Sequence, residues 1–291
     1  MSLSRRHILG GTFASLALAF TACSGASPDP VASSGTGSAG NGQFRTLDQI
    51  KSSGTVRIGV FSDKAPFGYI DADGKPAGYD VVYAERIGKD LGAQVDYVPV
   101  EAASRVEFLQ TAKVDIILAN FTVTPERGEK VDFANPYMKV SLGVVSPDSA
   151  LITEEPQLAG KKIIVVKGTT AEAWLAKNHP EIEPDKYEQY NDATSALADG
   201  RGDAWVTDNT EALAWAIASD GFTAGITALG DPDSIAGAVT KGNGTLLSWL
   251  NEHLVTLGKE QFFHADFEQT LRPVYGDSAS AEELVVEGGQ L

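Results

Sequence analysis

The sequence predicts an α/β fold with a mostly parallel sheet. From residue 56 onward, short apolar segments alternate with helical patterns in the order strand, helix, strand, helix, strand, which is typical of α/β proteins. Two apolar segments, 114–119 and 162–166, are continuous enough to be strands buried on both faces. The 291 residues are 43% hydrophobic and 21% charged, so the chain can form one large or two medium lobes.

The first half of the chain supplies strands that alternate with helix starts. The strands are expected at 56–61, 94–100 and 114–119. Asp80 is placed to cap a helix that Gly92 ends. Ser104 and Glu107 have the spacing of a capping box, which predicts a second helix start.

The second half continues the alternation after a break at 146–148, where a second lobe is expected to begin. The predicted strands before and after the break are 139–145, 162–166, 204–207 and 235–239. The predicted helices are 171–177, 193–199, one opened by Asp208, 246–257 and 260–271. The strand at 235–239 is expected to return to the first lobe, and residues 278–291 are expected to form a tail.

The segment 118–127 is the strongest candidate for a binding site. It follows a buried strand and leads into a helix start at Thr124, so it should lie in the crevice outside the carboxyl ends of the strands. Arg127 offers a planar fork that matches a carboxylate, and Thr122 and the carbonyl of Asn120 can accept an ammonium. Together they predict a site for an α-amino acid. The alternative is that Arg127 only caps a helix face and Thr122 only turns the loop.

Two further segments can contact the same ligand. The loop Gly168-Thr169-Thr170 precedes a helix, and backbone N–H groups at a helix start attract an anion, although most such loops are only strand-to-helix turns. Asp208 follows a strand and can bind an ammonium if its carboxylate faces a crevice. The commoner role of Asp at that position is an N-cap.

Charge and cysteine content exclude several classes of function. The formal net charge of −16 repels nucleic acid and anionic lipid. The single cysteine, Cys23, rules out an internal disulfide, and neither it nor the four histidines have metal-ligand spacing. The sequence has no nucleophile–base pair and no phosphate loop. We therefore expect no metal, no cofactor and no nucleic-acid partner.

The N-terminus is expected to be an export signal rather than part of the fold. Arg5 and Arg6 precede an apolar stretch that is short for a membrane-spanning helix, so residues 1–22 are predicted to be a signal peptide. The arginine pair fits a twin-arginine signal and an ordinary basic start equally well. The boundary before Cys23 resembles a bacterial lipobox, although Phe20 stands where Leu is usual. This resemblance implies cleavage before Cys23 and lipidation of its thiol.

Residues 23–46 are rich in Ser, Gly and Ala and are predicted to be a flexible tether. We therefore expect an exported protein that a lipid holds to the outer face of the bacterial cell membrane.

From about residue 47 to its end, the chain resembles the family-3 extracellular solute-binding proteins of amino-acid ABC importers. The stretches that carry the resemblance are Phe67-Gly68-Tyr69, Gly78-Tyr79-Asp80, 120–127, Val131-Asp132-Phe133, Pro136-Tyr137, 167–170, Gly202-Asp203-Ala204 and Asp208. The resemblance implies the two-lobed periplasmic-binding-protein fold of type II, with two crossovers and a ligand cleft between the lobes. Lobe 1 would comprise 47–142 and 236–277, and lobe 2 would comprise 143–235.

The resemblance also assigns roles to residues at matching positions. By position, the ligand α-carboxylate would be bound by Arg127, Thr122, Gly168, Thr169 and Thr170. The α-ammonium would be bound by Asp208, Asn120 and Thr122. Phe61 and Phe67 lie in the loop that often lines the side-chain pocket.

One departure from the family bears on the ligand. Where many relatives have an aromatic residue after the third strand, this chain has Glu-Ala-Ala-Ser-Arg at 101–105, which argues against a stacked aromatic wall. The segments similar to the cysteine-binding branch are 100–109, 137–140, 167–171 and 261–264. Cysteine is therefore the first ligand expected. Arg105 and Asp63 are candidates for the edge of the pocket, with a surface position as the alternative.

The resemblance implies a monomeric binding protein rather than an enzyme. It would capture a polar amino acid by lobe closure and deliver it to an ABC permease and its ATPase. Two alternatives stay open. A few relatives of this fold are dehydratases of small carboxylates, for which Asp208 or Glu101 could act as general acid or base. The same module can also serve in a sensor or an adhesin.

Overall fold

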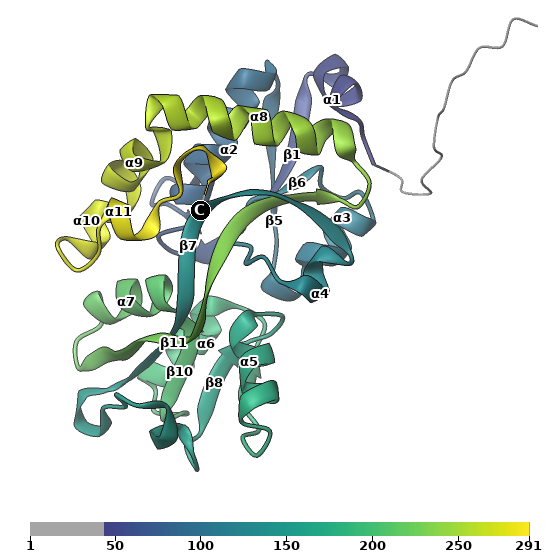
Figure 1. Ribbon diagram of the computed structural model, residues 1–291. Helices are drawn as coiled ribbons and strands as arrows, with labels where there is room; N and C mark the ends of the chain where they lie inside the picture. The colour runs from purple at the N-terminus through teal and green to yellow at the C-terminus, as the bar shows by residue number, and fades with distance from the viewer. Residues whose placement is uncertain (1–43, 291) are drawn as a thin grey trace, which may run out of the picture. The chain divides into compact units, whose positions relative to one another are not determined.

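The computed structural model describes residues 44–290, which Figure 1 shows as a coloured ribbon. The expected signal peptide, Cys23 and most of the expected tether lie outside the described residues. Among the helices of residues 44–290, none combines the length and the apolar character that crossing a bilayer requires.

An eight-stranded sheet runs through this part of the chain in the order β5-β1-β6-β11-β7-β10-β8-β9. Its strands are β1 (Thr55–Val60), β5 (Gln94–Pro99), β6 (Ile116–Ile117), β7 (Val131–Pro147), β8 (Ile163–Val166), β9 (Asp185–Tyr187), β10 (Ala204–Asp208) and β11 (Phe222–Thr240). A small sheet contains β2 (Asp63–Lys64), β3 (Gly68–Ile70) and β4 (Pro76–Ala77).

The elements of residues 44–290 gather into two lobes (Figure 1). The helices of the first lobe are α1 (Leu47–Ser53), α2 (Tyr79–Leu91), α3 (Arg105–Gln110), α4 (Pro125–Gly128), α8 (Gly244–Glu260), α9 (Phe262–Asp266), α10 (Arg272–Tyr275) and α11 (Ala281–Leu284). The helices of the second lobe are α5 (Thr170–Asn178), α6 (Tyr190–Ala198) and α7 (Asn209–Ile217). The first lobe also holds β1 to β6, and the second holds β8 to β10.

Two long antiparallel strands, β7 and β11, pass between the lobes. β11 pairs with β6 in the first lobe, and β7 pairs with β10 in the second, both antiparallel. The strands on either side are parallel to one another, as predicted: β5, β1 and β6 in one lobe, and β10, β8 and β9 in the other. The short strands predicted at 139–145 and 235–239 are therefore parts of two much longer strands.

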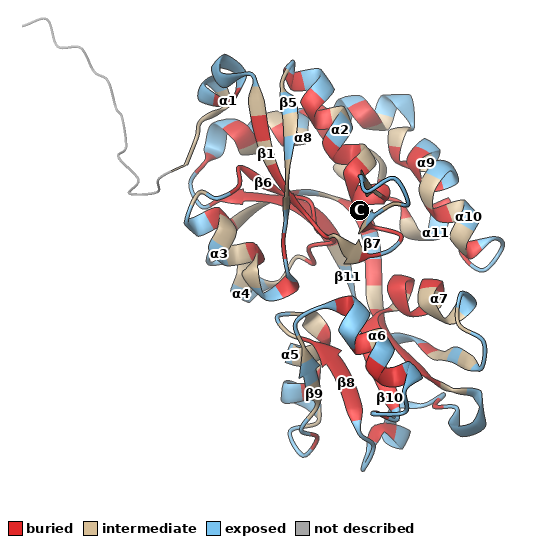
Figure 2. Ribbon diagram, turned by 180° about the vertical axis from the view of Figure 1, so that it is seen from behind, coloured by how far each residue is buried: buried red, intermediate tan, exposed pale blue. Residues whose placement is uncertain are grey.

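Apolar burial explains why these segments form a sheet. All four residues of β8 and all five of β10 are buried, and Figure 2 shows the inner strands of both lobes as mostly buried. One hydrophobic cluster contains residues of both lobes, including Phe61 and Val100 from the first and Ile164 and Trp205 from the second. The lobes are therefore packed against each other as well as connected.

Two helical segments differ from the prediction. The helix expected to begin at Asp80 begins at Tyr79, and its N-cap is Gly78 with φ 118°. A Cβ at Gly78 would lie 2.4 Å from the carbonyl oxygen of Phe67, so this position requires glycine. Asp80 is thus not the cap, and its carboxylate points inward. The helix expected at 260–271 is divided into α9 and a π-helical turn, Phe267–Leu271, before α10.

The residues expected to form a tail from 278 also fold. They form the short helix α11, and Val285 makes an isolated bridge with Met138 of β7. The backbone N–H of Val286 donates to the carbonyl of Tyr137 at 3.0 Å. The sequence did not indicate this because the pairing joins residues far apart in the chain.

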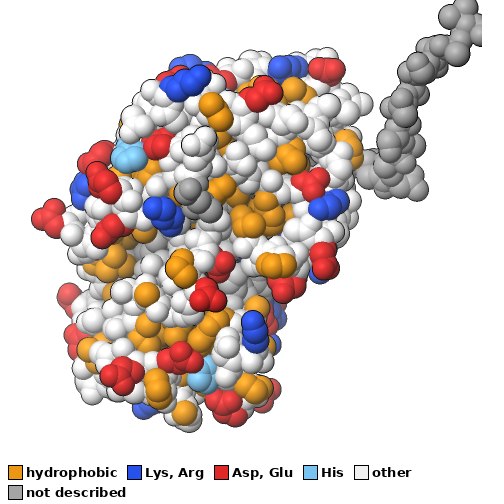
Figure 3. Space-filling view, viewed as in Figure 1, with side chains coloured by type: hydrophobic (Ala, Val, Ile, Leu, Met, Phe, Trp, Pro, Cys, Tyr) orange, Lys and Arg blue, Asp and Glu red, His pale blue; other side chains and the backbone are white. Residues whose placement is uncertain are grey.

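In the face shown in Figure 3, acidic side chains are spread over both lobes rather than gathered in one patch. Over the full sequence, 39 Asp and Glu residues outnumber 23 Lys and Arg residues, which gives the formal net charge of −16.

Candidate ligand-binding site between the lobes

Arg127 lies on the first turn of the helix that the sequence predicted. Thr124 caps α4, since its hydroxyl accepts a hydrogen bond from Arg127 N–H at 3.3 Å. The guanidinium donates to the carbonyl of Thr122 at 2.7 Å and reaches the second lobe, where it donates to the carbonyl of Gly168 at 2.9 Å. Its central carbon lies 4.9 Å from the ring centroid of Phe121.

Arg105 is a buried second guanidinium beside the first. It is 2% exposed, so the surface alternative is wrong. It donates to the carbonyls of Ala102 at 2.9 Å, Ala119 at 3.0 Å and Asn120 at 3.2 Å. It also donates to the carbonyl of Gly168 at 3.2 Å. Both arginines therefore converge on the same carbonyl oxygen.

Neither arginine has a carboxylate partner among residues 44–290, where the ion pairs involve other groups. Burial lowers the pKa of both, and the neighbouring Arg105 adds to the lowering of the pKa of Arg127 to about 9. Both stay charged at neutral pH. Carbonyl dipoles do not neutralise the charge of the two guanidiniums, so an anion can still bind to them. A guanidinium matches a carboxylate with two parallel hydrogen bonds.

Asn120 stands where the buried strand ends, and its backbone is held by Asp80. Its φ of 42° is left-handed, a conformation that Asn tolerates better than most residues. Its N–H donates to Asp80 Oδ2 at 2.7 Å, and Tyr137 Oη donates to Asp80 Oδ1 at 2.5 Å. Burial raises the pKa of Asp80 to about 6, although both hydrogen bonds lower it. Asp80 therefore fixes the position of Asn120 from behind the site.

The oxygens expected to receive an ammonium are partly engaged. The backbone carbonyls of Asn120 and Thr122 accept from Arg105 and Arg127, and a carbonyl oxygen that accepts one hydrogen bond has a second lone pair for an ammonium. The side-chain Nδ2 of Asn120 is buried without a hydrogen-bond partner among the described residues. An unsatisfied buried donor is a group that a polar ligand can complete.

Asp208 faces the first lobe rather than its own helix. It is the N-cap residue of α7, but its side chain makes no cap hydrogen bond. Its Oδ2 accepts from Lys64 Nζ, which reaches across from β2, at 2.7 Å. The alternative that Asp208 serves only as a cap is therefore wrong.

Lys64 is the main residue that sequence analysis missed. It is 1% exposed, and its ammonium also donates to Asn120 Oδ1 at 2.9 Å and Tyr190 Oη at 3.2 Å. Glu211 Oε2 lies 3.3 Å away. Burial lowers the pKa of Lys64, but Asp208 and Glu211 outweigh it and raise that pKa overall. Asp208 and Glu211 stand one helical turn apart in the sequence, and this pair of acids is the sequence feature that indicates a cation between them. Lys64 itself lies in a two-residue strand, and nothing in the sequence around it indicates a buried position.

Glu211 is the second carboxylate of this cluster. Thr207 Oγ1 donates to its Oε2 at 2.9 Å. Burial, together with the nearby charge of Asp208, raises the pKa of Glu211 to about 7, against the lowering effect of Lys64.

The loop 168–170 contributes an acceptor where donors were expected. Gly168 has φ 72°, and a Cβ there would lie 2.5 Å from the backbone of Ala103, so the lobes approach closely at this glycine. Its N–H is already bound to Glu172 Oε2 at 2.8 Å, while its carbonyl accepts from both arginines. Thr169 caps α5 by accepting from Glu172 N–H at 3.3 Å. Thr170 is the first residue of that helix.

Phe61 and Phe67, which the resemblance placed in the loop that often lines the side-chain pocket, are 1% and 0% exposed. Their ring centroids lie 5.7 and 5.8 Å from Lys64 Nζ. The two rings therefore surround a lysine of the protein itself.

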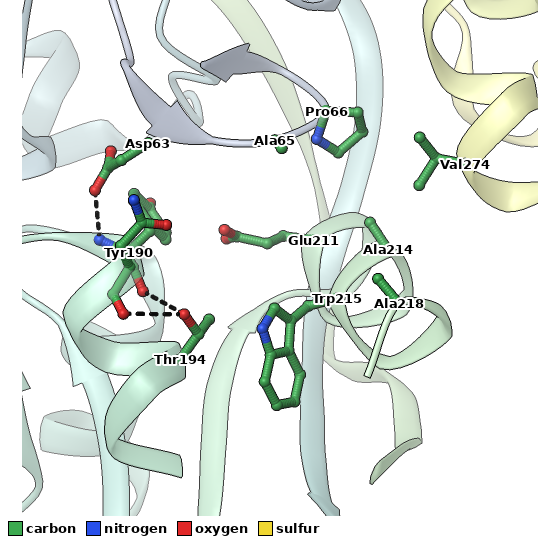
Figure 4. A pocket seen from close by; sticks show the side chains of 11 residues that line it. Asp63, Ala65, Pro66, Tyr190, Thr194, Glu211, Ala214, Trp215, Ala218 and Val274 are labelled. Atoms are coloured by element: carbon green, nitrogen blue, oxygen red, sulfur yellow. Dashed lines mark hydrogen bonds between the residues drawn. The ribbon is translucent and has the colours of Figure 1, made fainter. Parts of the chain in front are cut away.

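A cavity of about 310 Å³ adjoins this cluster (Figure 4). Asp63, Tyr190, Glu211 and Trp215 are among its lining residues, and the backbone N–H of Tyr190 donates to Asp63 Oδ2 at 2.8 Å. Of the residues that sequence analysis placed at the ligand site, only Asp63, a candidate for the edge of the pocket, lines this cavity. The cavity shares Tyr190 and Glu211 with the Lys64 cluster, and neither Arg105 nor Arg127 is among its lining residues.

Comparisons with known proteins match this arrangement to a family. The model of the bacterial extracellular solute-binding proteins, family 3, matches residues 56–267. A crystal structure of the solute receptor for L-cysteine of Neisseria gonorrhoeae is 49% identical, covering 84% of this chain and 100% of that one, with a TM-score of 0.82. The cysteine-binding protein of Campylobacter jejuni is also 49% identical, covering 83% and 98%, with a TM-score of 0.81.

A more distant relative extends the range of ligands. The glutamine-binding protein of a Bacillus subtilis ABC transporter is 30% identical over 215 residues, which are 72% of this chain and 78% of that protein. The resemblance stated from the sequence, including its cysteine-binding branch, is confirmed. The chain belongs to the bacterial extracellular solute-binding proteins, family 3.

Proposed function

We propose that this protein is the substrate-binding component of an amino-acid ABC importer, which closes its two lobes on one α-amino acid and delivers it to a permease and its ATPase. The observation that carries the proposal is that two oppositely charged groups both bridge the lobes. Arg127 of the first lobe donates to Gly168 of the second, and Asp208 of the second lobe accepts from Lys64 of the first. The charge of Asp208 also acts on Arg127. Arg127 lacks an anion, and Asp208 retains an oxygen, Oδ1, that accepts no hydrogen bond among residues 44–290.

The two ends of a zwitterion fit these groups. Its carboxylate would take the guanidinium donors of Arg127 and Arg105 that now reach the Gly168 carbonyl. Its ammonium would take Asp208 Oδ1. The hydroxyls of Thr122 and Thr170 would add hydrogen bonds, whereas the hydroxyl of Thr169 already donates to the carbonyl of Val166 at 2.6 Å. The unsatisfied Nδ2 of Asn120 would gain a partner.

L-Cysteine is the first ligand we propose. The support is similarity: the two crystal structures with 49% identity are of a solute receptor for L-cysteine and a cysteine-binding protein. The charge groups described above are common to any α-amino acid, so they support the class of ligand and not its side chain.

Binding would be coupled to a hinge in the strands between the lobes. We propose lobe boundaries at 47–142 with 236–277, and at 143–235, which place both crossings inside β7 and β11. Bending at these crossings would separate Arg127 from Gly168 and Lys64 from Asp208, and would open the site.

We further propose that residues 1–22 direct export, that Cys23 carries a lipid, and that residues 23–46 tether a monomeric domain to the outer face of the cell membrane. The support is the basic and apolar pattern before the single cysteine. Substituting Cys23→Ser should release the exported protein from the membrane fraction, while the purified protein binds its ligand unchanged.

A thermal-shift screen of the twenty amino acids tests the proposal. A ligand at one hundred times its Kd stabilises by about 2.7 kcal/mol, which raises the Tm of a domain of this size by about 5–10 °C. We expect L-cysteine, under reducing conditions, to give the largest shift. The absence of a shift with all twenty would contradict the proposal. We also propose binding without turnover, so L-cysteine incubated with the protein should be recovered unchanged.

A further inference from the structure

Lys64 fills a site that is built for an ammonium. Its three donor protons have three acceptors, Asn120 Oδ1, Tyr190 Oη and Asp208 Oδ2, at 2.9, 3.2 and 2.7 Å. Glu211 adds a second carboxylate at 3.3 Å, and Figure 4 shows the Glu211 side chain extending toward Tyr190. The side chain is 1% exposed, so this site lies in the interior between the lobes.

Aromatic rings enclose the same ammonium. The centroids of Phe61, Phe67 and Tyr190 lie 5.7, 5.8 and 4.6 Å from Lys64 Nζ. The central guanidinium carbon of Arg105 lies 5.4 Å from the centroid of the same Phe61 ring. The space where a ligand side chain would meet these rings is therefore occupied by one cation and flanked by another.

We propose that Lys64 determines the specificity of the site, by restricting the ligand to amino acids whose side chains are small and carry no positive charge. The inference rests on the proposed function. Asp208 is shared: its Oδ2 holds Lys64, and its Oδ1 is left for the ligand ammonium. A ligand with a basic side chain would bring a further cation into a space that already contains Lys64 and Arg105.

The physical basis is repulsion between like charges at short distance, together with occupied volume. Two unit charges a few ångströms apart repel by a few kcal/mol in a protein interior of intermediate dielectric. We expect a discrimination of about 100-fold between L-cysteine and L-lysine, which corresponds to about 2.7 kcal/mol. Neutral amino acids with long side chains, such as L-glutamine, would be disfavoured by volume alone.

Calorimetric titration of the wild type and two variants tests the proposal, with L-cysteine, L-serine, L-glutamine, L-ornithine and L-lysine as probes. Lys64→Ala removes both the charge and the volume and leaves Asp208 and Glu211 able to accept a side-chain ammonium. The ratio of L-lysine Kd to L-cysteine Kd should fall at least tenfold. Lys64→Gln removes the charge but keeps a donor and most of the volume, so the ratio should fall by a smaller factor.

The matched control is Lys75→Ala, an exposed lysine in the turn between β3 and β4, which should keep the wild-type ratio. Circular dichroism establishes that each variant is folded. A wild type that binds L-lysine within tenfold of L-cysteine overturns the inference, as does an unchanged ratio in either folded variant. In either of these outcomes, the proposed function is still supported if the wild type binds L-cysteine. A wild type that binds no amino acid contradicts the proposed function itself.

Discussion

At one end of the closed site, Arg105 and Arg127 donate only to backbone carbonyls; at the other end, Lys64 lies against the carboxylates of Asp208 and Glu211. We refer to these as the arginine end and the lysine end. Lys64 and Arg105 are buried and Arg127 is partly buried, and both ends bridge the lobes. They differ in charge balance. The arginine end has two guanidiniums and no carboxylate partner among residues 44–290, whereas the lysine end has one ammonium and two carboxylates.

This difference teaches how a zwitterion can enter an interior that is already hydrogen-bonded. The arginine end gains an anion and loses only contacts to carbonyl dipoles. The lysine end has to share: the incoming ammonium takes the free oxygen of Asp208 while Lys64 keeps the other. The carboxylate should therefore contribute more to affinity than the ammonium.

The largest effect should come from the arginine end. Truncating one partner of a buried charge pair costs about 2–5 kcal/mol, so Arg127→Ala should weaken L-cysteine binding by about 30- to 3,000-fold. Cysteamine, which lacks the carboxylate, should bind wild type and variant alike. Titration calorimetry measures both, with the exposed Arg201→Ala as control. Equal losses for cysteine and cysteamine would place the carboxylate elsewhere.

The lysine end should give a pH dependence of stability. The pKa of Glu211 is raised from 4.5 to about 7 by burial, so the folded protein binds a proton that the unfolded chain has released. The stability from this group is complete below pH 4.5 and is lost as the pH rises through 7, by up to about 3 kcal/mol. Glu211→Gln should remove this part of the decline in urea unfolding free energy. The exposed Glu252→Gln should not. An identical pH profile in Glu211→Gln would show that folding leaves the pKa of Glu211 unchanged, which would contradict the prediction.

Asp80 supports both ends, since it holds the backbone of Asn120 between them. Asp80→Asn exchanges an acceptor of two hydrogen bonds for an amide, which should lower the unfolding free energy by about 1–3 kcal/mol. Affinity should fall by less than in Arg127→Ala, because no ligand contact is lost. Tyr137→Phe removes only one of the two bonds and should have roughly half the effect on stability. If Asp80→Asn weakens binding without changing stability, Asp80 contacts the ligand instead.

The smallest effect should come from the cap that sets the direction of Arg127. Thr124 accepts the N–H of Arg127 at 3.3 Å, and loss of such a cap costs about 0.5–2 kcal/mol. Thr124→Ala should therefore weaken L-cysteine binding by only a few fold, and Thr124→Ser should restore it. A loss as large as that of Arg127→Ala would mean that the loop has a direct role.

The arginine end could be predicted from the sequence and the lysine end only in part. Arg127 follows a buried strand and a helix start with a capping threonine, which are local signals. Asp208 stands at the end of a strand and was identified for the same reason. Lys64 lies in a two-residue strand, and its partners are 56, 126 and 144 residues away in the chain. Only the folded chain brings them together.

The fold likewise has features that local sequence signals predict and features that depend on long-range contacts. The parallel strands follow from apolar runs, and the start of α4 follows from its capping threonine, which are local features. The start of α7 was also found from Asp208, although its side chain makes no cap hydrogen bond. Local signals do not predict the full length of β7 and β11, because each strand pairs with different partners in the two lobes. Asp80 was expected to be a cap because it stands near a helix start; the glycine before it takes that position and leaves the carboxylate free to hold Asn120.

A crystal structure of the L-cysteine complex tests the central claim most directly. The account predicts the ligand carboxylate on the guanidiniums of Arg127 and Arg105, its ammonium on Asp208 Oδ1, and Lys64 still bound to Asp208 Oδ2. A ligand seated in the cavity of Figure 4, with Arg127 and Asp208 both turned away from it, would contradict the account.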